Sequence, residues 1–248
     1  MKLERPIAAG NTAEIYCQDK MIFKVFKDHL PDGEAIYEAE KQKYAYSCGL
    51  PVPRVIDVTN MDGKQVIIME YVRGRTIGEL LLEDFAQAEY FLRISVDIQR
   101  KIHAVNADGM EPMSEKLRRQ IEAAAYLDDS KKGVLIEKIA AMNVENRLCH
   151  GDFHLHNLIM SQHDITIIDW VDASIGDIRA DVYRTYLLYT QHATELADMY
   201  VRLYCEKSGL TKDEIFDWAP IIAGARLAEN VGIEEQERLL RIVNAFFS

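Results

Sequence analysis

The chain has 248 residues, 48% of them hydrophobic, and a formal net charge of −11 at pH 7. Such a charge would repel DNA or RNA, because nucleic-acid affinity comes from clustered Lys and Arg side chains. Residues 1–6 contain no apolar signal segment, and no run of about eighteen uncharged apolar residues follows them. We therefore expect a cytoplasmic protein with neither a nucleic-acid nor a membrane partner.

The first 74 residues consist mainly of short apolar or alternating runs, which are typical of strands. Residues 33–47 instead carry apolar positions at helical spacing, and the Pro-Val-Pro sequence at 51–53 would end a helix. We expect a small antiparallel sheet with one helix. Its strands would cover residues 6–9, 15–18, 21–26, 54–59 and 65–71.

From residue 75 onward the apolar spacing is mostly helical. Helices are expected over residues 77–82, 85–105, 114–126, 133–142, 194–207, 212–230 and 234–247. Residues 148–160 and 165–170 interrupt this pattern as short apolar runs that carry His, Asp and Asn. The change near Gly74 predicts an α+β protein with two lobes, residues 1–74 and 75–248.

The most informative segment is His-Gly-Asp-Phe-His-Leu-His-Asn at residues 150–157, followed by Ile-Ile-Asp-Trp at 167–170. Buried polar groups cost free energy unless they have partners, so a polar cluster between apolar runs suggests a chemical task. Phosphoryl transfer needs a carboxylate near the acceptor hydroxyl and hard oxygen ligands that hold Mg²⁺ against nucleotide phosphates. Asp152, Asn157 and Asp169 would supply the carboxylate and two oxygen ligands for Mg²⁺.

This pattern resembles the aminoglycoside phosphotransferase and choline kinase family, relatives of the protein kinases. The resemblance implies a protein-kinase-like, two-lobed α+β fold, with a nucleotide-binding N-terminal lobe and a mainly helical C-terminal lobe that carries the catalytic loop and acceptor site. It also implies that Asp152 is the catalytic base and that Asn157 and Asp169 are the metal ligands. His150 and Asp181 would be scaffold residues that support the catalytic loop.

A kinase also needs a strand lysine that neutralises the α and β phosphates and a helix glutamate that holds this lysine. Lys24 fits, because strand alternation places it on one face with Ile22 and Phe26, where an unpaired lysine would be costly. The family's spacing between the glutamate and Pro-Val-Pro selects Glu38 as the partner, with Glu40 as the second choice.

Two further segments of the N-terminal lobe would contact the nucleotide. The strand that ends in Glu70, Tyr71 and Val72 resembles the kinase hinge, whose backbone hydrogen-bonds adenine. The turn at Gly10 has one glycine where protein kinases have three, and Thr12 within it is a candidate contact for the β-phosphate. The absence of Asp-Phe-Gly and Ala-Pro-Glu from their usual places argues against protein substrates.

Together, the residues and the resemblance predict an enzyme, a small-molecule kinase that uses ATP and Mg²⁺ to phosphorylate an acceptor hydroxyl. Aminoglycosides, choline-like amines and sugars are candidate acceptors. Asp172, Glu195 and Asp198 could contact a cationic acceptor. The oligomeric state is open.

Two other classes of protein also remain open. His150, Asp152, His154 and His156 alternate along the chain and could ligate a transition metal in a metal-dependent hydrolase. A noncatalytic nucleotide-binding protein with a kinase-like fold would carry the same residue types. The strand lysine, helix glutamate and Pro-Val-Pro sequence favour the kinase over the hydrolase, because a hydrolase needs none of them.

Overall fold

The computed structural model describes residues 3–142, 144–162, 164–191, 193–229 and 231–247. The chain divides into two compact units. Unit 1 comprises residues 1–84 and 155–172, and unit 2 comprises residues 85–154 and 173–248. Unit 1 therefore combines the N-terminal part of the chain with the segment that bears Asn157 and Asp169.

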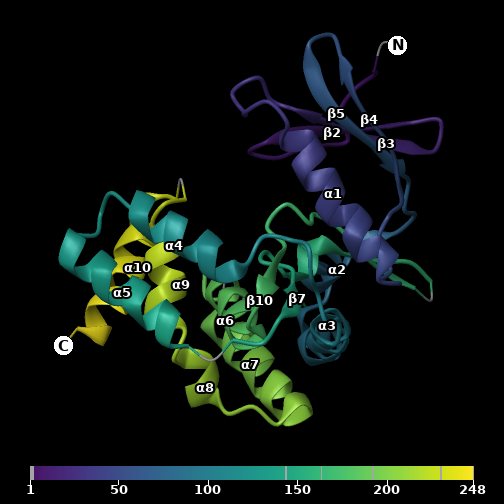
Figure 1. The fold of residues 1–248 in the computed structure, drawn as a ribbon. Helices are drawn as coiled ribbons and strands as arrows, with labels where there is room; N and C mark the ends of the chain where they lie inside the picture. The colour runs from purple at the N-terminus through teal and green to yellow at the C-terminus, as the bar shows by residue number, and fades with distance from the viewer. Residues whose placement is uncertain (1–2, 143, 163, 192, 230, 248) are drawn as a thin grey trace. The chain divides into compact units, whose positions relative to one another are not determined.

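Unit 1 contains a five-stranded antiparallel sheet in the order β1-β2-β3-β5-β4 (Figure 1). Its strands are β1 (Ala8–Ala9), β2 (Ala13–Gln18), β3 (Met21–Phe26), β4 (Val55–Met61) and β5 (Lys64–Glu70). Helix α1 (Glu34–Ser47) packs against β4 and β5. Its Ala35 and Ala39 join Phe26 and Ile67 in a buried cluster. The expected sheet with one helix is confirmed.

A three-stranded sheet in the same unit joins segments that are far apart in the sequence. It consists of β6 (Arg75–Thr76), β8 (Leu158–Met160) and β9 (Ile165–Ile167), in the order β6-β8-β9. Helix α2 (Ile77–Glu83) follows β6 and begins with a capping box between Thr76 and Glu79. Because β6 pairs with β8, residues 155–172 group with the N-terminal part of the chain.

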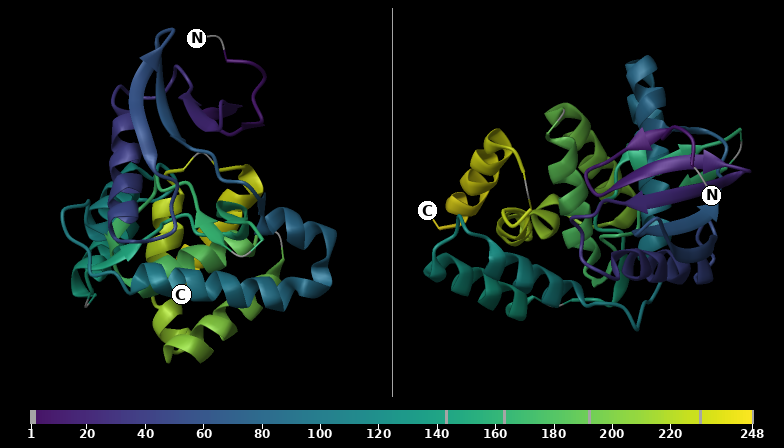
Figure 2. Two further views of the ribbon diagram at one scale, coloured as in Figure 1. Left: turned by 90° about the vertical axis from the view of Figure 1, so that its right-hand side faces the viewer. Right: turned by 90° about the horizontal axis from the view of Figure 1, so that it is seen from above.

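Unit 2 is mainly helical, as expected. After the short 3₁₀ helix η1 (Phe85–Gln87) come α3 (Ala88–His103), α4 (Met113–Ala123), α5 (Asp129–Ala141), α6 (Ile178–Tyr189), α7 (Thr194–Ser208), α8 (Lys212–Phe216), α9 (Ala219–Arg226) and α10 (Ile233–Phe246). Helix α9 packs against α4, α5 and α10 (Figures 1 and 2). The antiparallel strands β7 (Arg147–Cys149) and β10 (Ser174–Gly176) lie in the same unit. β7 leads directly into residues 150–154.

Several helical expectations differ from the structure: α5 begins at Asp129, four residues before the expected start, and the expected helix over residues 85–105 is divided into η1 and α3. The expected helix over residues 212–230 is divided into α8 and α9. Pro220 lies in the first turn of α9, where its missing N–H is tolerated, but its ring would clash with a helical turn before it, so the helix cannot run through it. Asn230, at the expected end, lies outside the described residues. The apolar spacing also misses α6, which begins after Asp177, an N-cap whose side chain accepts a hydrogen bond from Arg179 N.

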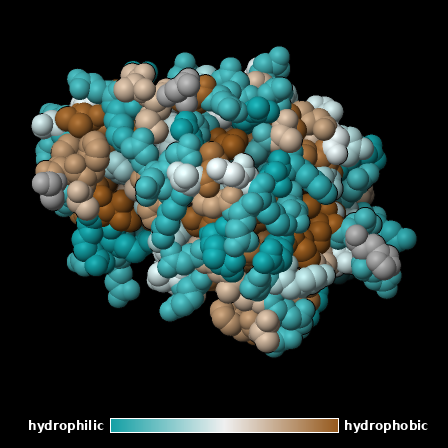
Figure 3. Space-filling view, turned by 90° about the horizontal axis from the view of Figure 1, so that it is seen from below, coloured by the Kyte–Doolittle hydropathy of each residue, from teal (hydrophilic) through white to brown (hydrophobic). Residues whose placement is uncertain are grey.

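Each unit buries large side chains of its own. Unit 1 buries Phe23, Phe26 and Trp170, and unit 2 buries Tyr200, Tyr204 and Trp218. On the face shown in Figure 3, hydrophobic residues form separate patches between hydrophilic ones. Within the described ranges, no helix is both long and apolar enough to cross a membrane.

Candidate active site

Lys24 is buried in unit 1 together with two carboxylates. Its Nζ lies 2.6 Å from Glu38 Oε1 and 3.0 Å from Asp169 Oδ1. Burial alone would lower the pKa of Lys24, but the charges of Asp169 and Glu38 outweigh this effect and raise it. Lys24 is therefore a cation held between two acidic groups. Glu40, the second candidate partner, is exposed.

Helix α1 contributes three buried polar side chains on one face: Glu38, Lys41 and Gln42. Burial raises the pKa of Glu38 in spite of the attraction of Lys24. Lys41 Nζ donates to the carbonyl of Val171 at 2.7 Å, and Gln42 Nε2 donates to the carbonyl of Pro53 at 2.7 Å. Sequence reasoning missed Lys41 and Gln42, although their spacing of three and four residues from Glu38 was a usable signal.

The antiparallel pairing of β8 and β9 brings Asn157 and Asp169 to the same end of the small sheet. Leu158 lies opposite Ile167, and Ile168 N donates to the Asn157 carbonyl at 3.0 Å. Asp169 has a φ of 64°, a left-handed conformation that is uncommon outside glycine and is concentrated at functional sites. Asn157 is buried, whereas the Asp169 side chain is 39% exposed. Both offer the oxygen ligands that Mg²⁺ prefers.

The other expected nucleotide contacts lie at the ends of strands in unit 1. Thr12 is exposed in the turn before β2, and its carbonyl accepts a hydrogen bond from Lys27 N at 2.9 Å. The Glu70 N–H donates a hydrogen bond to the Arg54 carbonyl at 3.0 Å, so this N–H is already used within unit 1. Tyr71 is exposed and Val72 is half-buried.

Asp152 lies in unit 2, shortly after β7. Its Oδ2 is 3.4 Å from His154 Nε2, and its Oδ1 is 3.8 Å from Arg184 Nη2. Burial would raise the pKa of Asp152, but the hydrogen bond from His154 and the charges of His154, Arg184 and His150 hold it well below its usual range. Asp152 is therefore a carboxylate at neutral pH, and with a side chain 25% exposed it can contact a ligand.

Asp181, on α6, anchors the backbone next to Asp152. Its Oδ1 accepts a hydrogen bond from Gly151 N at 2.7 Å, and its Oδ2 accepts from His103 Nε2 at 2.9 Å and Gln99 Nε2 at 3.0 Å. Burial would raise the pKa of Asp181, but the hydrogen bonds and the charge of His103 lower it to about 2. The buried carboxylate thus fixes the loop that carries Asp152.

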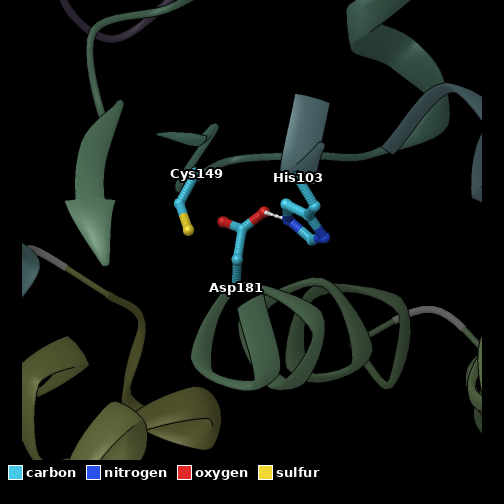
Figure 4. A group of neighbouring side chains, drawn as sticks. All are labelled: His103, Cys149 and Asp181. Carbon is cyan, nitrogen blue, oxygen red and sulfur yellow. Dashed lines mark hydrogen bonds and ion pairs between the residues drawn. The ribbon is translucent and has the colours of Figure 1, made fainter. Parts of the chain in front are cut away.

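His103, Cys149 and Asp181 form the one group of potential metal ligands within 4.8 Å of one another among the described residues (Figure 4). Metal binding by cysteine requires the thiolate. Burial, followed by the charge of Asp181, raises the pKa of Cys149 well above its usual value. His103 Nδ1 also lies 2.6 Å from the Tyr204 hydroxyl, so both ring nitrogens are hydrogen-bonded. Asp181 thus holds the loop of residues 150–154 through Gly151, and the raised pKa of Cys149 disfavours the thiolate that a metal would need.

The alternating histidines of the hydrolase alternative occupy different environments. His150 is buried edge-to-face against Phe153, and its Nδ1 accepts a hydrogen bond from Asp152 N at 3.3 Å. The His156 ring packs so closely on Gly78 of α2 that a Cβ at Gly78 would collide with it. The group of potential metal ligands found in the described part of the chain includes none of these histidines. The hydrolase alternative gains no support.

Arg184 is a site residue that sequence reasoning missed. Its Nε donates to the Gly151 carbonyl at 3.1 Å, and its Nη1 and Nη2 lie 2.8 and 3.3 Å from the carboxylate oxygens of Glu229. One guanidinium thus contacts the backbone of Gly151, Asp152 and Glu229. Its position three residues after Asp181 on α6 was the available signal, because residues at this spacing share a helix face.

Solved structures define the class of fold. A thermostable mutant of aminoglycoside phosphotransferase APH(4)-Ia in its apo form matches with a TM-score of 0.74 at 15% identity, covering 99% of this chain and 95% of that chain. The ternary complex of a related mutant with ADP and hygromycin B gives a TM-score of 0.73 at 15% identity, covering 97% and 93%. A choline kinase from Cryptosporidium parvum Iowa II gives 0.64 at 13% identity, covering 99% and 88%. The chain has the protein-kinase-like fold of these proteins.

Residues 4–221 match the model of the phosphotransferase enzyme family, APH. The chain belongs to this family. Acyl-CoA dehydrogenase family member 11 of Homo sapiens is 24% identical over 229 residues, which cover 83% of this chain and 26% of that protein. The Pongo abelii protein of the same name is 27% identical over 61% of this chain and 22% of its own length. This chain spans about a quarter of the length of the curated relatives it matches.

Proposed function

We propose that the protein is a small-molecule kinase that transfers the γ-phosphoryl group of Mg²⁺·ATP to an alcohol. The contact of the buried Lys24 with Glu38 and Asp169 carries this proposal, since a kinase needs a held lysine for the phosphates and a carboxylate for the metal. Membership of the phosphotransferase family supports the reaction class. The complex of a structural relative with ADP and hygromycin B supports a nucleotide and a small-molecule acceptor.

In this proposal, unit 1 supplies the groups that bind the nucleotide. Lys24 contacts the α and β phosphates, and Glu38 holds Lys24 in place. Asn157 and Asp169 hold Mg²⁺, which when bound neutralises charge on the transferred phosphoryl group. The backbone of residues 70–72 binds adenine, and Thr12 contacts the β-phosphate.

Asp152 of unit 2 orients the acceptor hydroxyl and takes its proton. The transition state of phosphoryl transfer is loose, so the carboxylate serves chiefly to position the nucleophile and need not be a strong base. A low pKa suits this task, because Asp152 remains ionised and its orientation is fixed by His154 and Arg184. The functional division into a nucleotide-binding part, residues 1–74, and an acceptor part, residues 75–248, belongs to this proposal.

The acceptor is an alcohol, and its charge is a separate question. The expectation of a cationic acceptor rests on Asp172, Glu195 and Asp198. Of these, Asp198 already lies 3.3 Å from Lys212 Nζ, which offsets its charge. A cytoplasmic location, where ATP is abundant, goes with the proposal.

The test is ADP formation from Mg²⁺·ATP across aminoglycosides, choline, ethanolamine, hydroxylated amino acids and sugars, with Asp152→Asn beside the wild type. Acceptor-dependent turnover should fall by about 10²–10⁴-fold in the variant, the range typical of a lost general base. ATP affinity, measured by calorimetry, should stay nearly unchanged. Full turnover in Asp152→Asn would refute the assignment of the base, and a wild type without ATP binding would refute the kinase proposal.

A further inference from the structure

Arg226, the last residue of α9, is a buried cation with unused hydrogen-bond donors. Its side chain is only 7% exposed. Its Nε and Nη1 are among the buried atoms that have no hydrogen-bond partner in the described part of the structure. Burial, followed by the charge of Arg184, lowers the pKa of Arg226 to about 10, which still leaves the guanidinium charged at neutral pH. A buried donor without an acceptor is costly and rare, so it calls for an explanation.

The neighbouring carboxylates do not satisfy these donors. Glu229 Oε2 is 3.4 Å from Arg226 Nε, and Glu235 Oε1 is 3.7 Å from Arg226 Nη2. Charge-assisted N–H···O hydrogen bonds are shorter, about 2.7–2.9 Å. Glu229 instead bonds Arg184 at 2.8 Å, and Glu235 bonds Arg238 at 2.7 Å. Both carboxylates are therefore directed to other arginines.

This arrangement lies next to Asp152. Arg184 contacts Asp152 Oδ1 at 3.8 Å and shares Glu229 with Arg226. The Glu229 side chain is 31% exposed, compared with 12% for Arg184 and 7% for Arg226, so it is the most solvent-accessible of the three. A ligand that displaced this carboxylate would meet two guanidinium groups.

We propose that Arg184 and Arg226 form an oxyanion subsite beside Asp152, and that the natural acceptor is an alcohol carrying a carboxylate or phosphate a few bonds from its reacting hydroxyl. Glu229 fills this subsite from within the chain until the acceptor displaces it. The inference rests on the proposed kinase function, because it names the acceptor class of the same site. The hydroxyl oxygen bonds to the γ-phosphorus, the bond from this phosphorus to the bridging oxygen of ADP breaks, and the hydroxyl proton passes to Asp152. The oxyanion of the acceptor stays unchanged.

Matched acceptors test the charge requirement. 4-Hydroxybutyrate is compared with its neutral amide, 4-hydroxybutyramide, and glycerol 3-phosphate with glycerol. Binding to the full chain is measured by calorimetry with and without Mg²⁺·AMP-PNP, and kcat/KM is measured from ADP formation. At least one charged probe should exceed its neutral counterpart in affinity and in kcat/KM by about tenfold or more. The pair with the larger difference shows whether the subsite prefers a carboxylate or a phosphate. Equal binding within both pairs, or no binding of either oxyanion, would overturn the proposal.

Two variants with opposite expected effects separate a ligand site from a structural ion-pair cluster. Arg226→Met should weaken oxyanion binding by about tenfold or more, because it removes the unsatisfied donors. Glu229→Gln should strengthen it severalfold, because the internal competitor loses its charge. A structural cluster would give weaker or unchanged binding in both variants. Arg202→Met is the control, since it removes an arginine from an exposed pair with Glu206 on α7.

Thermal unfolding shows whether each variant is folded. If Arg226→Met does not fold, Arg226→Lys and Glu229→Gln decide the question, and an unchanged oxyanion affinity in Glu229→Gln counts against the proposal. The wild type could phosphorylate neutral or cationic alcohols, lose this turnover in Asp152→Asn, and show no preference for oxyanions. That result would support the kinase function and refute only the subsite. Failure to bind ATP would refute the kinase function, while calorimetry without nucleotide would still test the subsite.

Discussion

Replacing Glu38 by glutamine removes one of the two negative charges that hold Lys24. The Nζ–Oε1 contact is 2.6 Å and buried, and removing one partner of such a pair generally costs about 3–5 kcal/mol. The loss should be smaller here, about 1–3 kcal/mol, because Asp169 remains 3.0 Å from Nζ and glutamine can still accept a hydrogen bond. Urea unfolding gives the free energy of unfolding, and an ATP titration should show weaker binding because Lys24 is less firmly positioned.

Glu40→Gln is the matched control for this variant. It removes the same charge from the same helix, two residues away, but at an exposed position. Surface substitutions of this kind change stability little. Equal effects of Glu38→Gln and Glu40→Gln on unfolding and on ATP binding would show that the loss of charge, rather than the contact with Lys24, is responsible, and would refute the reasoning.

The remaining predictions concern one buried and one exposed aspartate. The folded-state pKa of Asp181, about 2, lies below the ordinary value of 3.8, so its carboxylate stabilises the fold above about pH 4, and this contribution disappears as the pH falls towards 2. Asp181→Asn should therefore be less stable than the wild type at pH 7, and its unfolding free energy should depend less on pH between 4 and 2; parallel pH curves for the two proteins would contradict this. Asp169→Asn should raise the Mg²⁺ concentration needed for half-maximal turnover by about tenfold or more, whereas an unchanged Mg²⁺ dependence would remove Asp169 from the metal site.

The contact between Lys24 and Glu38 could be foreseen from one local regularity together with the family resemblance. Strand alternation directs Lys24 to one face of β3. The spacing between the glutamate and Pro-Val-Pro that the family resemblance implies selects Glu38 on α1. The protein-kinase-like fold was implied by the family resemblance that the 150–157 and 167–170 segments carry. These segments are unusual because they place several polar residues between apolar ones, which gives a signal that does not depend on distant parts of the chain.

The composition of unit 1 could not be foreseen, because it depends on a long-range pairing. Strand β6 has only two residues, Arg75 and Thr76, and two residues carry no periodicity. Their pairing with β8 becomes apparent only when Met160 and Ile159 lie opposite them. A boundary placed by composition near Gly74 therefore cannot reveal that residues 155–172 join the N-terminal part of the chain.

The sequence did not predict Arg184 and Arg226 as site residues, because their positions also depend on long-range packing. An arginine on a helix usually lies at the surface, and nothing local distinguishes it from one that is buried by packing. Arg226 is buried and Arg184 is half-buried, on two helices, α9 and α6, that pack against each other within unit 2. Their shared contact with Glu229, which follows α9, arises only from this packing.

The net charge of −11 and the charge around Asp152 favour different acceptors. A negative protein attracts cations at long range, but salt screens charges separated by more than about 8–10 Å at physiological ionic strength. Near Asp152 the relevant groups are His154 and Arg184, which lower the pKa of the carboxyl, and Arg226, a buried arginine that shares Glu229 with Arg184. Screening weakens such buried interactions far less than the field of the whole protein. Arg184, which contacts Asp152, and its neighbour Arg226 should therefore decide, more than the overall charge, which acceptor the proposed site selects.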